Sequence, residues 1–189
     1  TFDPVHIAHL RLAIEAFEIL NLDQLFWTPV GIPGHREAPI APAADRVKML
    51  ELAIKNQPDF IIDTTDALAA TPTYTVSTLL RFRKQFGPDR PLVLLLGADA
   101  FLGLPAWRHW QALFSLAHIA IARRPGYALA AKDPQLHTVW QDRQADIHAI
   151  RSSPTGKIIE FELPELDISS STIRNKLMIG HSRISIYLA

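Results

Sequence analysis

Two histidines lie three residues apart in the otherwise apolar stretch TFDPVHIAHLRLA, residues 1–13. If a helix starts here, this spacing places the rings of His6 and His9 on one face. The first turn of a helix offers free N–H groups and the positive end of its dipole, which favour an anion. Imidazoles add donors and take up charge beside a phosphate. By itself the pair fits a phosphate site, a structural role or a metal site, for which only Asp3 is near as a third ligand.

A run of hydroxyl residues, ISSSTIR, lies near the other end of the sequence, from Ile168 to Arg174. Small hydroxyl residues at the start of a helix cap it or bind an anion. Arg174 follows one turn later and reaches the same anion. The alternative is an ordinary serine cap followed by a surface arginine.

The elements that must position these residues alternate along the chain. Apolar periodicity predicts helices, and short apolar runs predict strands. The predicted helices are Ile7 to Leu20, a helix capped near Asp45 that runs through Ile54, Thr75 to Phe86, and Ser170 to Ile179, and the predicted strands are Leu25 to Val30, Phe60 to Asp63, Pro91 to Leu96, His118 to Ala122, and KIIEFEL. This alternation predicts an α/β fold, a doubly wound parallel sheet, in one domain over residues 1–189. Such sheets bind ligands at the carboxyl ends of their strands.

The composition excludes several classes of protein. Of 189 residues, 48% are hydrophobic and 20% charged, as in a globular protein. No apolar run is long enough to span a membrane, and no secretory signal is visible. The absence of cysteine rules out disulfides and thiolate chemistry and fits the cytoplasm, where we expect the protein to act. A net charge of zero argues against broad nucleic-acid binding.

Both runs resemble signatures of the nucleotidylyltransferase superfamily. TFDPVHIAHL resembles Gly-x-Phe-Asp-Pro-x-His-x-Gly-His, with Ala8 at the last glycine, and ISSSTIR resembles Ile-Ser-Ser-Thr-x-Ile-Arg, with Ser171 at the threonine. These enzymes join a substrate phosphate to the α-phosphate of ATP and release pyrophosphate. The resemblance implies a Rossmann-like nucleotidylyltransferase fold, with His6, His9 and Arg174 as catalytic groups. It implies ATP contacts at Thr1, Phe2, His6, His9, Ser170, Ser171 and Arg174.

The middle of the chain resembles the bacterial nicotinate-nucleotide adenylyltransferases. The similar segments are PTYTVSTL, LLGADAFLGLPAWRHWQALF and AHIAIARRPGY. This resemblance implies that ATP and nicotinate mononucleotide are converted to deamido-NAD and pyrophosphate in NAD biosynthesis. It implies that Trp107 stacks on the nicotinate ring, that Tyr74 and Thr75 hold its carboxylate and that Arg124 faces its phosphate. The alternatives are core packing for Trp107 and an ordinary helix start at Tyr74 and Thr75, which is compatible with a ligand there.

Further ATP contacts follow from the same resemblance. Gly97 and Asp99, in the GAD turn after a predicted buried strand, are expected to hold the adenosine ribose, and the alternative for Asp99 is an ordinary solvated loop residue. Arg36 stands where the family has a phosphate-binding cation. The family also has an arginine at Arg46, and the alternative there is a charge on the surface of a helix. Mg²⁺ is expected to be carried by ATP and water, with no metal site made by the protein, since the sequence has no dense cluster of carboxylates.

The family's first strand and Gly-Gly pair would precede Thr1, so we expect the chain as given to start inside the family's first loop. The expected partners are small-molecule substrates, with no nucleic acid and no membrane. The sequence makes no prediction of oligomeric state. Two enzyme alternatives are adenylyl transfer to nicotinamide mononucleotide or to phosphopantetheine. A third alternative is a module that binds a nucleotide without catalysis.

Overall fold

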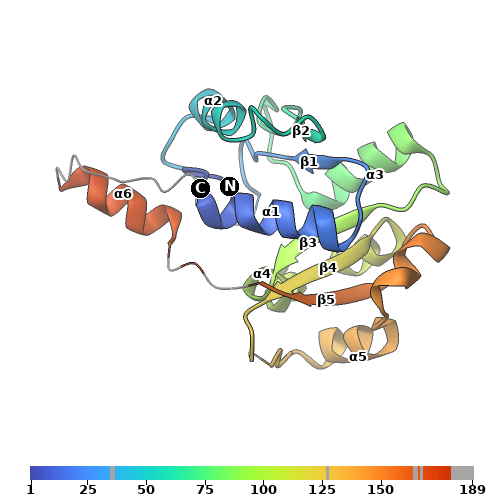
Figure 1. Cartoon of the computed structure of the whole chain (residues 1–189). Helices are drawn as coiled ribbons and strands as arrows, with labels where there is room; N and C mark the ends of the chain where they lie inside the picture. Colours follow the sequence, from blue (N-terminus) through green and yellow to red (C-terminus); the bar gives the residue numbers. More distant parts are fainter. Residues whose placement is uncertain (35–36, 127, 164–165, 167, 180–189) are drawn as a thin grey trace. The chain divides into compact units, whose positions relative to one another are not determined.

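The computed structural model describes residues 1–34, 37–126, 128–163, 166 and 168–179 (Figure 1). The chain divides into two compact units. The first unit comprises Thr1–Thr73 and Glu165–Ala189, and the second comprises Tyr74–Pro164. Within the described ranges, no helix combines the length and the apolar character needed to cross a membrane.

The first unit is built on a parallel pair of strands joined through a helix. Its elements are α1 (Ile7–Ile19), β1 (Leu25–Trp27), α2 (Ala43–Ala53), β2 (Phe60–Ile62) and α6 (Ser170–Met178). Leu25 lies opposite Phe60 and Trp27 lies opposite Ile62 in the ladder. The core of this unit consists of buried side chains from both strands, α1, α2 and the residue after α2: Leu10, Ala13, Trp27, Leu50, Ile54 and Phe60.

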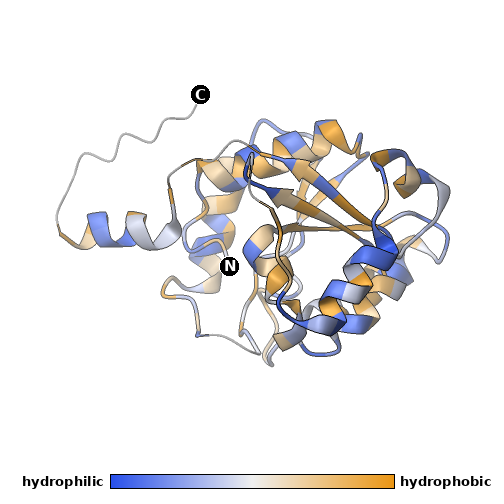
Figure 2. Ribbon diagram, turned by 90° about the horizontal axis from the view of Figure 1, so that it is seen from below, coloured by the Kyte–Doolittle hydropathy of each residue, from blue (hydrophilic) through white to orange (hydrophobic). Residues whose placement is uncertain are grey.

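The second unit contains a three-stranded parallel sheet in the order β3-β4-β5. Its elements are α3 (Thr75–Phe86), β3 (Val93–Gly97), α4 (Ala98–Leu102), β4 (His118–Arg123), α5 (Pro134–Arg143) and β5 (Ile158–Glu162), with short 3₁₀ turns at Leu104–Ala106, Trp110–Ser115 and Ile147–Ser152. The central strand β4 is buried at every residue except its last. Apolar residues dominate the strands, whereas the helices carry both polar and apolar residues (Figure 2). The apolar run of β4 is expected for a parallel strand that is covered on both faces.

The predicted helices and strands form within one or two residues of the expected bounds, except at the end of the first strand; β3, for example, begins at Val93 and not at Pro91. The strand predicted from Leu25 to Val30 ends at Trp27. Its last ladder bond runs from Asp63 N–H to the Trp27 carbonyl, and Pro29 beyond it has no N–H to donate. The helix predicted to be capped near Asp45 begins earlier, at Ala43, so Asp45 lies in its first turn.

One buried histidine serves the fold of the second unit. His118, at the start of β4, is fully buried. Its Nδ1 accepts the N–H of Lys157 at 3.1 Å, so Nε2 carries the proton and donates to the Ser153 carbonyl at 2.8 Å. Burial lowers the pKa of this imidazole, which keeps it neutral. These contacts connect β4 with the segment that leads into β5.

Candidate functional site

His6 and His9 form a contacting pair at the start of α1. His6 is the N-cap and His9 is the third helical residue. The backbone N–H of His6 donates to Nδ1 of His9 at 3.3 Å, and the two ring centroids are 3.8 Å apart. Because Nδ1 of His9 accepts this bond, its ring proton lies on Nε2. The sequence prediction that both rings share one face is therefore confirmed.

The surroundings of this pair keep both rings neutral. Phe2 packs edge-on against His9 and also contacts Trp27, each with ring centroids 5.2 Å apart. Burial lowers the pKa of His6, and burial together with the charge of His6 lowers the pKa of His9 to about 3. The Nδ1 atom of His6 is buried, with no hydrogen-bond partner among the described residues. An arriving phosphate would raise both pKa values and draw protons to the rings.

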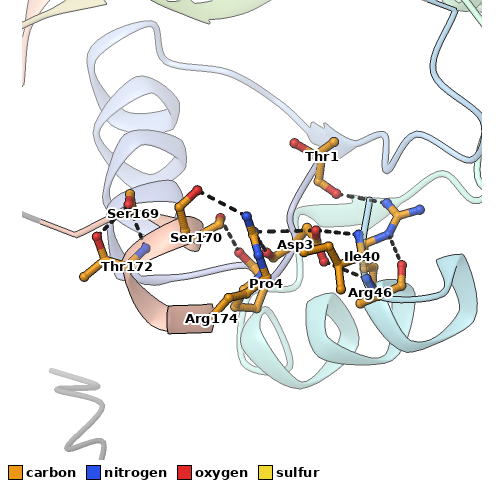
Figure 3. A network of polar contacts seen from close by, with 11 residues as sticks. Thr1, Asp3, Pro4, Ile40, Arg46, Ser169, Ser170, Thr172 and Arg174 are labelled. Carbon is orange, nitrogen blue, oxygen red and sulfur yellow. Dashed lines mark hydrogen bonds and ion pairs between the residues drawn. The ribbon is translucent and has the colours of Figure 1, made fainter. Parts of the chain in front are cut away.

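Arg46 anchors the loop that precedes the histidines (Figure 3). It is only 1% exposed, so the alternative of a surface charge is wrong. Its guanidinium donates to three backbone carbonyls: to Ala41 at 3.1 Å, to Thr1 at 2.9 Å and to Val30 at 2.6 Å. Phe2, which follows the anchored Thr1 carbonyl, has a φ of +54°, in the left-handed region that non-glycine residues rarely adopt. The contacts of Arg46 thus help to hold an uncommon backbone conformation beside the histidines.

The two signature runs meet within the first unit. Ser169 caps α6 by accepting the N–H of Thr172 at 3.1 Å. The hydroxyl of Ser170 donates to the carbonyl of Pro4 at 2.9 Å. Nη1 of Arg174 donates to the carbonyl of Asp3, and Nη2 of Arg174 donates to the Ser171 hydroxyl at 3.2 Å (Figure 3).

These contacts bring Ser170 and Arg174 next to Pro4 and Asp3, which lie 166 and 171 residues earlier in the sequence. Hydroxyl, imidazole and guanidinium groups are donors suited to a polyphosphate. Among the described residues, no group of three or more His, Cys, Asp or Glu side chains is placed to hold a metal ion. Arg36, the remaining predicted phosphate contact, lies outside the described residues.

The remaining predicted residues belong to the second unit. Gly97 ends β3 and caps α4, and the exposed Asp99 lies in the first turn of α4. Tyr74 is the N-cap of α3, and its carbonyl accepts the N–H groups of Ser77 and Thr78. Trp107 is half-buried and packs against the core of this unit, and Arg124 is exposed just after β4. Core contact and ligand contact are compatible for a half-buried tryptophan.

Arg108 is a neighbour of Tyr74 that the sequence analysis did not single out. Its guanidinium carbon lies 4.8 Å from the centroid of the Tyr74 ring, a cation–π contact. The first turn of α3 contains no acidic residue. Arg108 therefore adds positive charge at the end of α3 where the helix dipole is already positive. The sequence does contain a signal for Arg108, because it is a charged residue between two tryptophans, Trp107 and Trp110.

A separate open hollow of about 390 Å³ lies between β4, β5 and α5. None of the predicted site residues lines it. Glu160 accepts from Trp140 Nε1 at 2.9 Å and pairs with Arg123 at 3.4 Å within the hollow. These polar groups satisfy one another, so the chemistry of this hollow does not match that of a phosphate site.

Comparison with known proteins identifies the family. A family model described as cytidylyltransferase-like matches residues 1–176. A probable nicotinate-nucleotide adenylyltransferase of Dechloromonas aromatica (strain RCB) is 43% identical over 180 residues, which cover 94% of this chain and 83% of that protein. The chain belongs to the nicotinate-nucleotide adenylyltransferase family. A second probable nicotinate-nucleotide adenylyltransferase, from Methylococcus capsulatus (strain ATCC 33009 / NCIMB 11132 / Bath), is 42% identical over 183 residues, 96% of this chain and 87% of that protein.

A solved structure supports the fold expected for a nicotinate-nucleotide adenylyltransferase. The Plasmodium falciparum nicotinic acid mononucleotide adenylyltransferase complexed with NaAD matches with a TM-score of 0.62 and 19% sequence identity. The match covers 93% of this chain and 80% of that one. The predicted Rossmann-like α/β fold with parallel strands is confirmed.

We predict that Arg46 contributes strongly to stability. Arg46→Met removes the buried guanidinium that donates to the backbone carbonyls of Thr1, Val30 and Ala41, and should lower the free energy of unfolding by about 3 kcal/mol or more. Arg46→Lys should recover part of this loss, because one ammonium cannot reach all three carbonyls. The exposed Arg11, paired with Glu15 at 2.6 Å, provides the control. Arg11→Gln should cost less than about 1 kcal/mol in urea unfolding, and equal losses for Arg46→Met and Arg11→Gln would contradict the prediction.

The lowered pKa of His9 predicts a loss of stability in acid. The ordinary histidine value is 6.5, so the unfolded chain binds this proton more readily than the folded one. The stabilisation is therefore complete above pH 6.5 and is lost as the pH falls from 6.5 toward about 3. His9→Gln removes this titration, so its free energy of unfolding should fall less steeply than that of the wild type between pH 7 and 4. Exposed His148→Gln should follow the wild type, and parallel curves for wild type and His9→Gln would refute the assignment.

Proposed function

We propose that this protein transfers the adenylyl group of ATP to nicotinate mononucleotide, giving deamido-NAD and pyrophosphate in NAD biosynthesis. The observation that carries this proposal is the joining of the two signature runs by Ser170 and Arg174, which contact the loop before His6. Identity of 43% and 42% with probable nicotinate-nucleotide adenylyltransferases supports the choice of substrate.

The chemistry is an in-line displacement at the α-phosphorus of ATP. A phosphate oxygen of nicotinate mononucleotide forms the new P–O bond while the bond to the pyrophosphate oxygen breaks. The nucleophile is already an anion, so no general base and no covalent intermediate are needed. Catalysis then consists of positioning the two phosphates and neutralising the charge that develops between them.

The donors of the first unit supply that neutralisation. His6 and His9 begin as neutral rings and gain positive charge when a phosphate comes near, because its charge raises their pKa values. Arg174 carries its positive charge both before and after the phosphate binds. The backbone at Thr1 and Phe2 and the hydroxyls of Ser170 and Ser171 complete the contacts to the triphosphate, together with Arg36.

Mg²⁺ enters with ATP in this proposal. The contributing side chains are cations, imidazoles and hydroxyls, a set that fits phosphate oxygens and leaves the ion to ATP oxygens and water. When bound, Mg²⁺ neutralises part of the triphosphate charge. Gly97 and Asp99 hold the adenosine ribose, with the Asp99 carboxylate accepting from its hydroxyls.

Residues of the second unit select the acid substrate. The indole of Trp107 stacks on the flat nicotinate ring, and Arg124 faces the nucleotide phosphate. The backbone N–H groups at Tyr74 and Thr75 donate to the nicotinate carboxylate at the positive end of α3. A neutral nicotinamide gains less at this position, which favours the acid over the amide.

A pyrophosphate-release assay tests the proposed function, with His9→Ala as the informative variant. We expect release from ATP with nicotinate mononucleotide, and less with nicotinamide mononucleotide or phosphopantetheine. His9→Ala should lower kcat by about 100-fold or more, as for loss of an electrostatic donor, with a small change in melting temperature.

Exposed His148→Ala is the matched control and should keep full activity. Nucleotide binding without pyrophosphate release from any of the three substrates would contradict the proposal. Parallel losses of stability and activity in His9→Ala would instead assign His9 to the core.

Arg108 is predicted to increase the preference for the acid. Arg108→Gln removes a positive charge beside Tyr74 and should lower the ratio of kcat/KM for nicotinate over nicotinamide mononucleotide by about threefold or more. Arg81→Gln is a matched control, because Arg81 makes a similar cation–π contact with Phe82, at 4.9 Å, within the same helix. An unchanged ratio in Arg108→Gln, or an equal fall in Arg81→Gln, would refute this role.

A further inference from the structure

Asp3 connects the two signature runs from a buried position. The residue is 7% exposed, and its carboxylate accepts two backbone N–H groups, from Ile40 at 2.9 Å and from Ala41 at 3.0 Å. Nη1 of Arg174 lies 3.5 Å from Oδ2 of Asp3 and donates to the backbone carbonyl of the same residue. One residue therefore holds the guanidinium through both its side chain and its backbone (Figure 3).

The helix that carries Arg174 depends on such polar contacts. None of the described residues of α6 is buried: Ile173 is half-buried, and the apolar side chains of Leu177 and Met178 are 58% and 81% exposed. Packing of an apolar face therefore contributes little to its orientation. Hydrogen bonds from Ser170 and Arg174 to the carbonyls of Pro4 and Asp3 tie it to the first unit.

We propose that Asp3 is a positioning residue, which orients Arg174 for phosphate transfer without touching the substrate. The proposal rests on the proposed function. An unrestrained arginine loses much rotamer freedom when it binds a ligand, and prior orientation avoids that loss. The carboxylate is itself fixed by Ile40 and Ala41, so it offers Arg174 a rigid partner. Nη2 is held on the other side by the Ser171 hydroxyl.

The alternative is that Asp3 only stabilises the turn at Ile40 and Ala41. The two roles differ in their coupling to Arg174. A positioning role acts through the guanidinium and disappears when the guanidinium is removed. A purely structural role acts on the fold and has the same effect with or without Arg174.

A double-mutant cycle separates these roles. Asp3→Asn, Arg174→Gln and the double variant are compared by pyrophosphate release and by urea unfolding. We expect Asp3→Asn to lower kcat about tenfold or more, with a smaller change in KM for nicotinate mononucleotide. When Arg174→Gln is already present, adding Asp3→Asn should change kcat by less than about twofold. Equal factors in both backgrounds, or an unchanged kcat in Asp3→Asn, would overturn the proposal.

Asp146 provides the matched control for the loss of a carboxylate. Its Oδ1 accepts the N–H groups of His148 at 2.8 Å and Ala149 at 3.2 Å, so it stabilises a turn as Asp3 does. Asp146→Asn should leave kcat unchanged. A fall in kcat equal to that of Asp3→Asn would overturn the proposal, because it would assign the effect to turn stability.

Arg174→Lys extends the test to the case in which Asp3→Asn does not fold. Lysine keeps the charge but lacks the fork that contacts Asp3 and Ser171 together. We expect its kcat to fall nearly as far as that of Arg174→Gln, and a kcat equal to the wild type would overturn the proposal. The absence of pyrophosphate release by the wild type would refute the proposed function itself, whereas an active wild type with an additive cycle would refute only the role of Asp3.

Discussion

A buried charged group is costly unless hydrogen bonds compensate it, and this constraint shapes the loop that precedes His6. Arg46 meets the constraint with three backbone carbonyls, and Asp3 meets it with two backbone N–H groups and Arg174. The partners lie in the loop itself, in the segment after β1, in the segment before α2 and, for Arg174, in α6. Neither charge can be satisfied unless these segments come together, so folding of the first unit places the backbone of Thr1 to Val5.

The placed loop gives the histidines their chemical character. Phe2 packs against His9, and burial of the pair lowers the pKa of both rings in the absence of an anion. A histidine pair that is neutral in the free protein, and that gains charge only beside an anion, avoids holding two repelling imidazolium charges together. The same loop offers carbonyls to Ser170 and Arg174, so one backbone segment contacts both halves of the proposed phosphate site.

Local pattern was sufficient to predict the buried strands and the two signature runs. PLVLLL and HIAIA form β3 and β4, because a central parallel strand needs an unbroken apolar run. The roles of Arg46 and Asp3 could not be predicted this way, because most of their partners are backbone atoms, which leave no mark in the sequence, and because Arg174 is 171 residues away from Asp3. Histidine shows the same limit. His118 lies in an apolar run as His6 does, and its contacts with the Ser153 carbonyl and the Lys157 N–H, 35 and 39 residues away, mark it as structural.

A crystal structure of the protein with a non-hydrolysable ATP analogue is the most direct test of the central claim, that one loop gathers both runs around a triphosphate. We expect phosphate oxygens within about 3 Å of the Nε2 atoms of His6 and His9 and of the Arg174 guanidinium. Asp3 should still contact Arg174 in that complex. A triphosphate bound away from these three side chains would contradict the account.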